Sequence, residues 1–146
     1  MFEKLAVQYY EEDELSVSLI NEIKACMLRA EAALQKELME IIRNNHVFHD
    51  WYVTSFNLYC EENITLCRIQ VSKRETQYVL KFDGVVSVAI YGEIASSAAD
   101  YPPRAQGDSF AQVLAFWIDY TDYYEICLLL DNERYIIIKA KAFMVN

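Results

Sequence analysis

The residues whose chemistry stands out first are His46, His49 and Asp50, and the two histidines are the only ones in the chain. Imidazole and carboxylate groups can ligate a divalent metal, and a histidine beside an aspartate can act as a general base. Either role needs further groups, because two histidines three positions apart do not complete a site. The sequence identifies no such groups, so it favours a surface or capping role over a metal or catalytic site.

Recognisable catalytic motifs do not occur in the sequence. It has no Gly-rich phosphate loop, nucleophile elbow, HExxH motif or Walker pattern, and it has three glycines in all. Backbone cradles for phosphate groups depend on glycine. We therefore expect no catalytic residues and no cofactor, and we expect that the protein is not an enzyme.

An acidic, tyrosine-rich segment is the best candidate for a contact with another protein. Its residues are Asp119, Tyr120, Asp122, Tyr123 and Glu125. Tyrosine offers a large contact area at low entropic cost, and carboxylates steer and then pair with Arg or Lys of a partner. The alternative is an ordinary solvated turn whose tyrosines cover the edge of a sheet.

Length and charge limit the possible partners. The 146 residues fit one domain, 1–146, and an apolar content of 54% predicts a compact fold. Twenty-two acidic and thirteen basic residues give a formal charge of −9. This balance argues against nucleic acid and anionic membranes, and it makes a basic protein partner possible.

The N-terminal segment and the cysteines indicate a cytoplasmic protein. The start, MFEKLAVQYYEEDEL, lacks the basic region and apolar core of a secretion signal, and no apolar run approaches the ~18 residues that span a bilayer. Cys26, Cys60, Cys67 and Cys127 have no CxxC spacing and lie within apolar runs. Reduced core thiols are favoured over a zinc site or disulfides.

A long N-terminal helix is predicted, beginning at Ser16 or Ser18 and capped by Asn44 and Asn45. Apolar residues recur at steps of three and four: Ile20, Ile23, Met27, Ala30, Leu34, Leu38 and Ile41. A helix lying on a sheet is favoured over a coiled-coil dimer, because the stripe lasts about three heptads and the rest of the chain is strand-rich. Residues 1–14 fit either a short strand or a helical turn.

Residues 53–88 predict a β-meander of four antiparallel strands. Asp83 and Gly84 stand between apolar runs and are typical of a hairpin turn. A bulge near Leu66 would reconcile the two phases of apolar residues in the second strand. The loop-like segment 96–108, which contains YPPR, either contacts a partner or merely connects elements.

Residues 113–145 predict a second meander of three strands. At an offset of sixty, Val53 aligns with Val113, Phe56 with Phe116 and Cys67 with Cys127. Either an internal duplication or two unrelated meanders with similar turns would produce this pattern.

The segments HDWYVTSFNLY, YVLKFDGVVSV and YEICLLLDNERYIIIKAKAF carry a resemblance that covers residues 45–143. In this succession the chain resembles small uncharacterised bacterial proteins of the domain-of-unknown-function kind, and it is similar to some immunity proteins of polymorphic toxin systems. The resemblance implies an α+β fold and a binding role.

These observations predict an α+β fold, with one long N-terminal helix packed on an antiparallel sheet of about seven strands in two β-meanders. The favoured function is a protein-binding module, such as an immunity protein that occludes a basic toxin. One alternative is a metal-binding protein or enzyme built on His46, His49 and Asp50. Another is a homo-oligomeric module that pairs through a sheet edge or the helix stripe, since the sequence leaves the oligomeric state open.

Overall fold

The computed structural model describes residues 2–11, 15–91, 111–131 and 133–146. Its helices are α1 (Phe2–Glu11), α2 (Val17–Ala33) and α3 (Lys36–Asn44), followed by the 3₁₀ turn η1 (His46–Phe48). Its strands are β1 (Tyr52–Glu61), β2 (Ile64–Lys73), β3 (Thr76–Tyr91), β4 (Ala111–Tyr120), β5 (Tyr124–Leu130) and β6 (Arg134–Val145). The fold is therefore α+β, with an antiparallel sheet as predicted.

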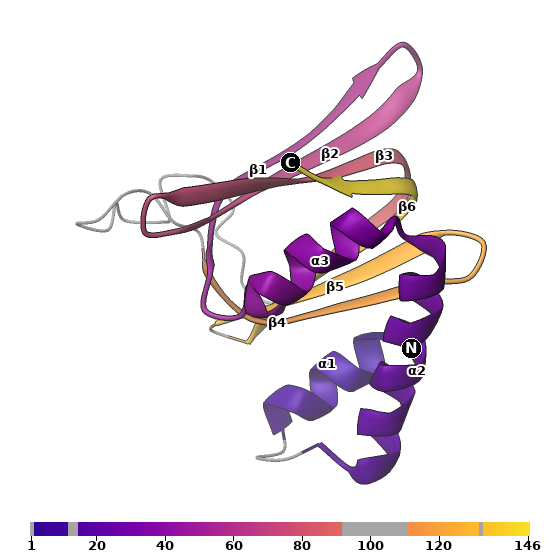
Figure 1. Cartoon of the computed structure of the whole chain (residues 1–146), viewed down its shortest axis with the longest axis vertical. Helices are drawn as coiled ribbons and strands as arrows, with labels where there is room; N and C mark the ends of the chain where they lie inside the picture. The colour runs from indigo at the N-terminus through magenta and orange to yellow at the C-terminus, as the bar shows by residue number, and fades with distance from the viewer. Residues whose placement is uncertain (1, 12–14, 92–110, 132) are drawn as a thin grey trace.

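The sheet closes into a barrel with the strand order β1-β2-β3-β6-β5-β4. Strands β3 and β6 pair over most of their lengths, whereas β1 and β4 meet at two residue pairs, Tyr52 with Gln112 and Val53 with Ala111. One seam of the barrel is thus long and the other short. In Figure 1, α1 and α2 lie beside the barrel below β4 and β5, and α3 crosses in front of the strands.

The single long helix of the prediction is wrong, because the chain breaks between α2 and α3. Leu34 and Gln35 have extended backbone angles, and the Leu34 amide still bonds the Ala30 carbonyl at 2.9 Å. Leu34 stays buried at this break while α3 turns toward the barrel. The predicted caps are confirmed: Ser16 Oγ accepts from the Leu19 amide, and Asn45 Nδ2 donates to the Ile41 carbonyl.

The buried face of α2 also differs from the predicted stripe. Leu19, Cys26 and Ala30 are buried, whereas Ile20 is exposed. The helix lies against β4, which is the sheet-packed arrangement that the sequence favoured over a coiled coil. The undecided N-terminal segment forms α1. The Tyr10 hydroxyl ties α1 to the β5–β6 turn, since it lies 2.6 Å from the Leu130 carbonyl and accepts from the Leu130 amide.

The barrel has six strands rather than seven, because Asp83 and Gly84 do not form a turn. Strand β3 runs through them, and Gly84 introduces a kink with a φ of +64°. The positive φ favours glycine, and a Cβ at Gly84 would also crowd the Lys141 side chain of β6 at 3.0 Å. The bulge predicted near Leu66 is wrong too: β2 pairs with β3 without a shift, and the irregularity lies at Thr54 in β1.

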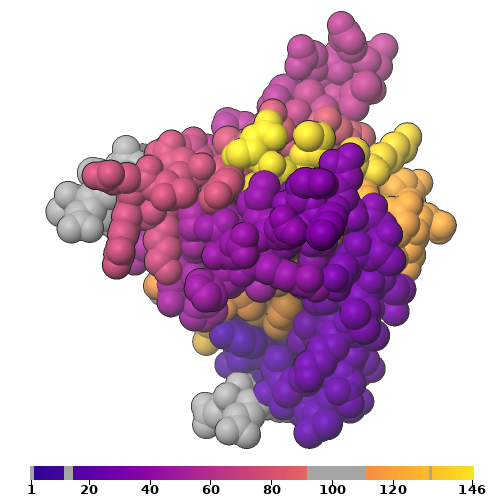
Figure 2. Space-filling view, viewed as in Figure 1, coloured from indigo at the N-terminus to yellow at the C-terminus, as the bar shows by residue number. Residues whose placement is uncertain are grey.

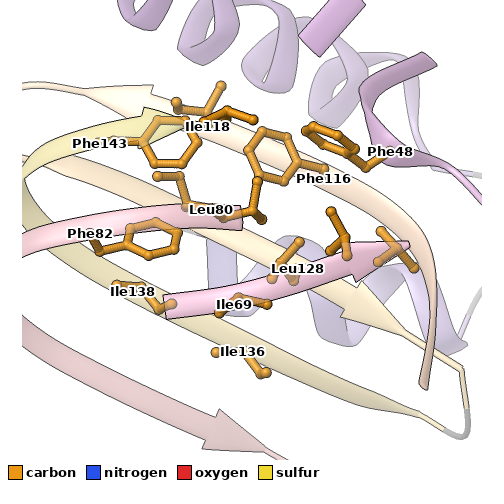
Figure 3. Close-up of a cluster of buried hydrophobic side chains, with 14 of the residues drawn as sticks. Phe48, Ile69, Leu80, Phe82, Phe116, Ile118, Leu128, Ile136, Ile138 and Phe143 are labelled. Carbon is orange, nitrogen blue, oxygen red and sulfur yellow. The ribbon is translucent and has the colours of Figure 1, made fainter. Parts of the chain in front are cut away.

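Two apolar clusters hold the fold together. The larger one fills the barrel and is closed by residues of α3 and η1 (Figure 3). Its labelled members are Phe48, Ile69, Leu80, Phe82, Phe116, Ile118, Leu128, Ile136, Ile138 and Phe143. The second cluster lies on the outer face of β4–β6, where Phe2 of α1 and Cys26 of α2 pack with Trp117 and Leu129. Each fully buried large side chain contributes ~1.5 to 3 kcal/mol.

The two meanders have matching registers. The ladder shifts between Val53 and Ser55 in β1, and it shifts between the residues sixty positions later in β4. Tyr52 pairs with its own counterpart, Gln112, so the meanders meet in a twofold-like manner. The predicted alignment of Cys67 with Cys127 is wrong, because the pairing makes Ile126 the counterpart of Cys67. This shared geometry supports the duplication over two unrelated meanders.

Candidate functional site

His46, His49 and Asp50 lie at the junction between α3 and β1, and Asp50 bonds this junction to β4. The Asp50 amide donates to the Val113 carbonyl at 2.9 Å, and Asp50 Oδ1 accepts from Gln112 Nε2 at 3.1 Å. His49 Nδ1 lies 3.1 Å from Asp50 Oδ2, and both side chains are about half exposed. Nowhere in residues 2–11, 15–91, 111–131 and 133–146 do three or more His, Cys, Asp or Glu side chains gather as a metal site would require.

The backbone of η1 explains the local shape. His46, Val47 and Phe48 have positive φ angles of 52°, 55° and 57°. This region is unfavourable for a β-branched residue such as Val47. The turn directs Phe48 into the barrel, where its ring lies 5.4 Å from Trp51 and 5.9 Å from Phe116. The junction is therefore a packed structural element.

The Asp119 carboxylate, near the tip of the β4–β5 hairpin, is paired within the chain. Arg29 of α2 donates to both carboxylate oxygens of Asp119, with Nε to Oδ1 at 2.9 Å and Nη2 to Oδ2 at 3.0 Å. The Tyr120 amide adds a third hydrogen bond at 2.8 Å. Burial alone would raise the pKa of Asp119, but these hydrogen bonds outweigh it and lower that pKa. The sequence offered no sign of the Arg29 partner, which lies 90 positions earlier.

The remaining candidates at this tip differ in how far they face solvent. Glu125 Oε2 lies 3.8 Å from Lys139 Nζ, and the Tyr124 hydroxyl donates to the Ala33 carbonyl at 3.2 Å. The Tyr120 and Tyr124 rings are in contact, with centroids 4.7 Å apart. Of the five predicted contact residues, Asp122 is exposed, Tyr120, Tyr123 and Glu125 are partly buried, and Asp119 is buried.

The β1–β2 hairpin presents a second, unforeseen surface. Its tip, residues 57–65, stands clear of the body of the molecule in Figures 1 and 2. Leu58, Tyr59 and Ile64 are 49%, 41% and 49% exposed, and Cys60 is exposed as well. Leu58 and Tyr59 are consecutive in a strand, so they point to opposite faces. The hairpin tip is thus apolar on both faces.

Acidic residues cap this tip. Glu62 and Asn63 have positive φ angles of 51° and 64°, which is the geometry of a two-residue hairpin turn. Glu61 and Glu62 are exposed, and β1 contains no Lys or Arg. The sequence of the tip, LYCEENI, shows this arrangement, because apolar residues stand directly before and directly after the acidic turn.

The edge of β1 that faces away from β2 lacks a described strand partner beyond Val53. Pairing with β4 ends there, although β1 continues to Glu61. The corresponding edge of β4 is covered by α2. The Ile118 amide contacts Met27 Sδ at 3.4 Å, and the Tyr120 amide donates to the Asp119 carboxylate. The two hairpins therefore share a register but differ in what covers them.

Comparisons with known proteins find similarity to solved structures and show no family. No family model matches the chain, and no curated protein matches it. The chain is similar to a crystal structure described as an uncharacterized protein from Neisseria gonorrhoeae, with a TM-score of 0.47 and 13% identity. The match covers 68% of this chain and 92% of that one. The likeness to immunity proteins is not found among these matches and stays a prediction.

No helix within residues 2–11, 15–91, 111–131 and 133–146 has the length and apolar character needed to cross a bilayer.

Proposed function

We propose that the protein is a non-catalytic protein-binding module that engages a basic partner through the tip of its β1–β2 hairpin. The projecting apolar tip carries the proposal. Leu58, Tyr59 and Ile64 expose large side chains on an element that nothing in the described structure covers. Apolar surface concentrated in this way is typical of interaction sites, whereas single exposed apolar residues are not.

Charge supports a basic partner. The chain has a formal charge of −9, and exposed acidic residues lie at both hairpin tips, Glu61 and Glu62 on one and Asp122 on the other. Such a field speeds encounter with a basic protein and weakens as salt is added. Asp122 and Tyr123 form a second contact in this proposal, while Asp119 acts in the fold through Arg29.

The finer form of the proposal is an immunity protein of the cytoplasm that occludes a basic toxin. It draws on the resemblance in residues 45–143 and on the acidic, apolar hairpin tip. Occlusion needs no catalytic group in the inhibitor, because bound side chains exclude the substrate of the toxin. Stoichiometric inhibition of a captured toxic enzyme would be the expected result.

The test uses the full chain as bait in its native cell, followed by purification of the captured protein and measurement of its Kd. The double variant Leu58→Asp/Ile64→Asp should raise the Kd by about thirtyfold or more, since loss of a single central contact residue already costs about 2 kcal/mol. High salt should weaken binding mainly through the association rate.

A matched control is Leu28→Asp, because Leu28 is 66% exposed on α2, away from the hairpin. This variant should bind as the wild type does. Retention of the partner by the double variant would sink the proposed function, and salt-independent binding would remove the basic partner from it.

A further inference from the structure

We infer that the partner binds by adding an extended, basic segment as a strand along the free edge of β1. This inference rests on the proposed function and specifies how the hairpin makes its contact. Addition of a strand to an open sheet edge is an established mode of peptide recognition, in which the main chain supplies affinity and alternate side chains supply specificity.

The first argument concerns backbone donors. In an antiparallel ladder, alternate residues bond one neighbouring strand, and the others direct their amides to the opposite edge. Glu61 and Ile64 close the two-residue turn of the β1–β2 hairpin, which places the amides of Leu58 and Cys60 on the edge away from β2. These amides are the counterparts of the Ile118 and Tyr120 amides.

The second argument is a contrast within the chain. The Ile118 amide contacts Met27, and the Tyr120 amide is bonded by Asp119. Residue 59, the counterpart of Asp119, is tyrosine, which has no carboxylate to offer to the next amide. None of the described helices takes the place along β1 that α2 takes along β4.

The third argument concerns edge protection. Proteins usually blunt open edges with Lys, Pro, bulges or a covering element. From Ser55 to Glu61, the edge contains no Lys, Arg, Pro or Gly, and its ladder with β2 has no further register shift. An incoming strand would therefore meet a regular edge that no described helix or strand covers.

The fourth argument selects the occupant. Leu58 on one face and Tyr59 on the other favour apolar side chains in the added strand, and Glu61 with Glu62 favours Lys or Arg where that strand passes the turn. A second copy of this chain would bring another formal charge of −9 to the same acidic tip. The charge thus favours a basic extended segment over self-association.

The experiment uses displayed random peptides of about twelve residues, selected on the full chain, with one enriched peptide then synthesised. Cys60→Pro removes an edge amide and leaves the ladder with β2 unbroken, whereas the matched control Cys60→Ala keeps the amide. We expect enriched peptides with alternating apolar residues and added Lys or Arg. Their Kd should rise about tenfold or more for Cys60→Pro and stay within about twofold for Cys60→Ala.

A second readout detects edge pairing directly. Bound peptide should slow hydrogen exchange at the amides of Leu58 and Cys60, an effect that side-chain contact alone would not produce. Urea unfolding of both Cys60 variants should show a folded protein. If Cys60→Pro does not fold, hydrogen exchange at the Leu58 and Cys60 amides of the wild-type complex tests strand addition by itself.

Several results would overturn strand addition: no enriched peptide, equal affinities of the two Cys60 variants, or unprotected edge amides in the complex. A dimer of the chain alone that Cys60→Pro dissociates would assign the edge to a second copy instead. Failure of strand addition is separable from failure of the proposed function. If strand addition alone fails, the Leu58→Asp/Ile64→Asp variant still no longer binds the natural partner. If the proposed function fails, that variant still binds it.

Discussion

The β4–β5 hairpin is buried by the rest of the chain, whereas the β1–β2 hairpin, built on the same register, stands in solvent. Ile118 is fully buried, and its counterpart Leu58 is 49% exposed. Both residues point to the concave side of their hairpins. The difference therefore arises from the surroundings, since α2 lies along β4 and no described helix lies along the tip of β1.

The outward-facing positions of the two meanders explain where the helices dock. In the second meander these positions are apolar, as at Trp117 and Leu129, and α1 and α2 cover them. Their counterparts in the first meander are Asn57 and Gln70, which suit solvent. The helices thus bind the one meander whose outer face is apolar.

Thiol reactivity should show the largest difference between the β1–β2 tip and the buried parts of the fold. Cys60 at the tip is exposed, while burial raises the pKa of Cys127 in the β4–β5 hairpin. Burial also raises the pKa of Cys67 to about 12 and of Cys26 to about 11. One thiol of four should react with an aromatic disulfide reagent in the native protein at pH 8. The others should react at least about a thousandfold more slowly, because they need local or global opening. Absence of the fast phase from Cys60→Ala is the control, and two fast thiols would contradict the structure.

Truncation of the paired positions should separate the hairpins by stability. Ile118→Ala leaves a cavity in the barrel and should lower the free energy of unfolding by about 2 to 4 kcal/mol. Leu58→Ala should lower it by less than about 1 kcal/mol, since the side chain is already half in water. Urea unfolding measures both values. Equal losses would mean that the β1–β2 tip is packed in solution.

Removal of the ion pair that fastens α2 to the β4 edge should have a smaller effect. The folded-state pKa of Asp119 is lowered, so its contribution to stability is present above the ordinary aspartate pKa of about 3.9 and is lost as the pH falls through the folded value. Asp119→Asn should cost about 1 kcal/mol at pH 7.

The wild type and Asp119→Asn should converge in stability as the pH falls through the lowered pKa of Asp119. Urea unfolding at pH 7 and at successively lower pH values makes this comparison. The control is Tyr59→Phe at the counterpart position, which should show no such pH dependence. A constant difference between the wild type and Asp119→Asn at all pH values would exclude the ionised carboxylate as the cause.

Local sequence patterns predicted the features that depend on residues close together in the chain, namely the strands and the helix caps. The apolar runs located the two meanders, and the Ser16 and Asn45 caps located the helix ends. No Gly or Pro near Leu34 marks the helix break in the sequence. The Leu34 side chain packs in the larger core cluster, and this tertiary contact is not visible in a local pattern. Asp83 and Gly84 resemble a turn locally, but β3 continues through them. Glycine suits the φ of +64° there, where Lys141 of the paired strand β6 also approaches closely.

The candidate site was predicted less well for a related reason. Composition marked the 119–125 tip as acidic, but it could not show that Arg29 already pairs with Asp119. The tip at Leu58 to Ile64 was missed because its apolar alternation looks the same as that of a buried strand. Exposure of those residues follows from the length of the hairpin beyond the barrel, which is a property of the whole fold.

The two ladders that join the meanders, a long one between β3 and β6 and a short one between β1 and β4, also bear on the order in which the barrel assembles. Each meander is made of strands that follow one another along the chain, so its contacts close short loops. The β3–β6 ladder instead joins residues such as Leu80 and Val145, and β1 meets β4 at two pairs alone. Each meander can therefore form before the barrel exists, whereas the barrel exists only after the two meanders have met.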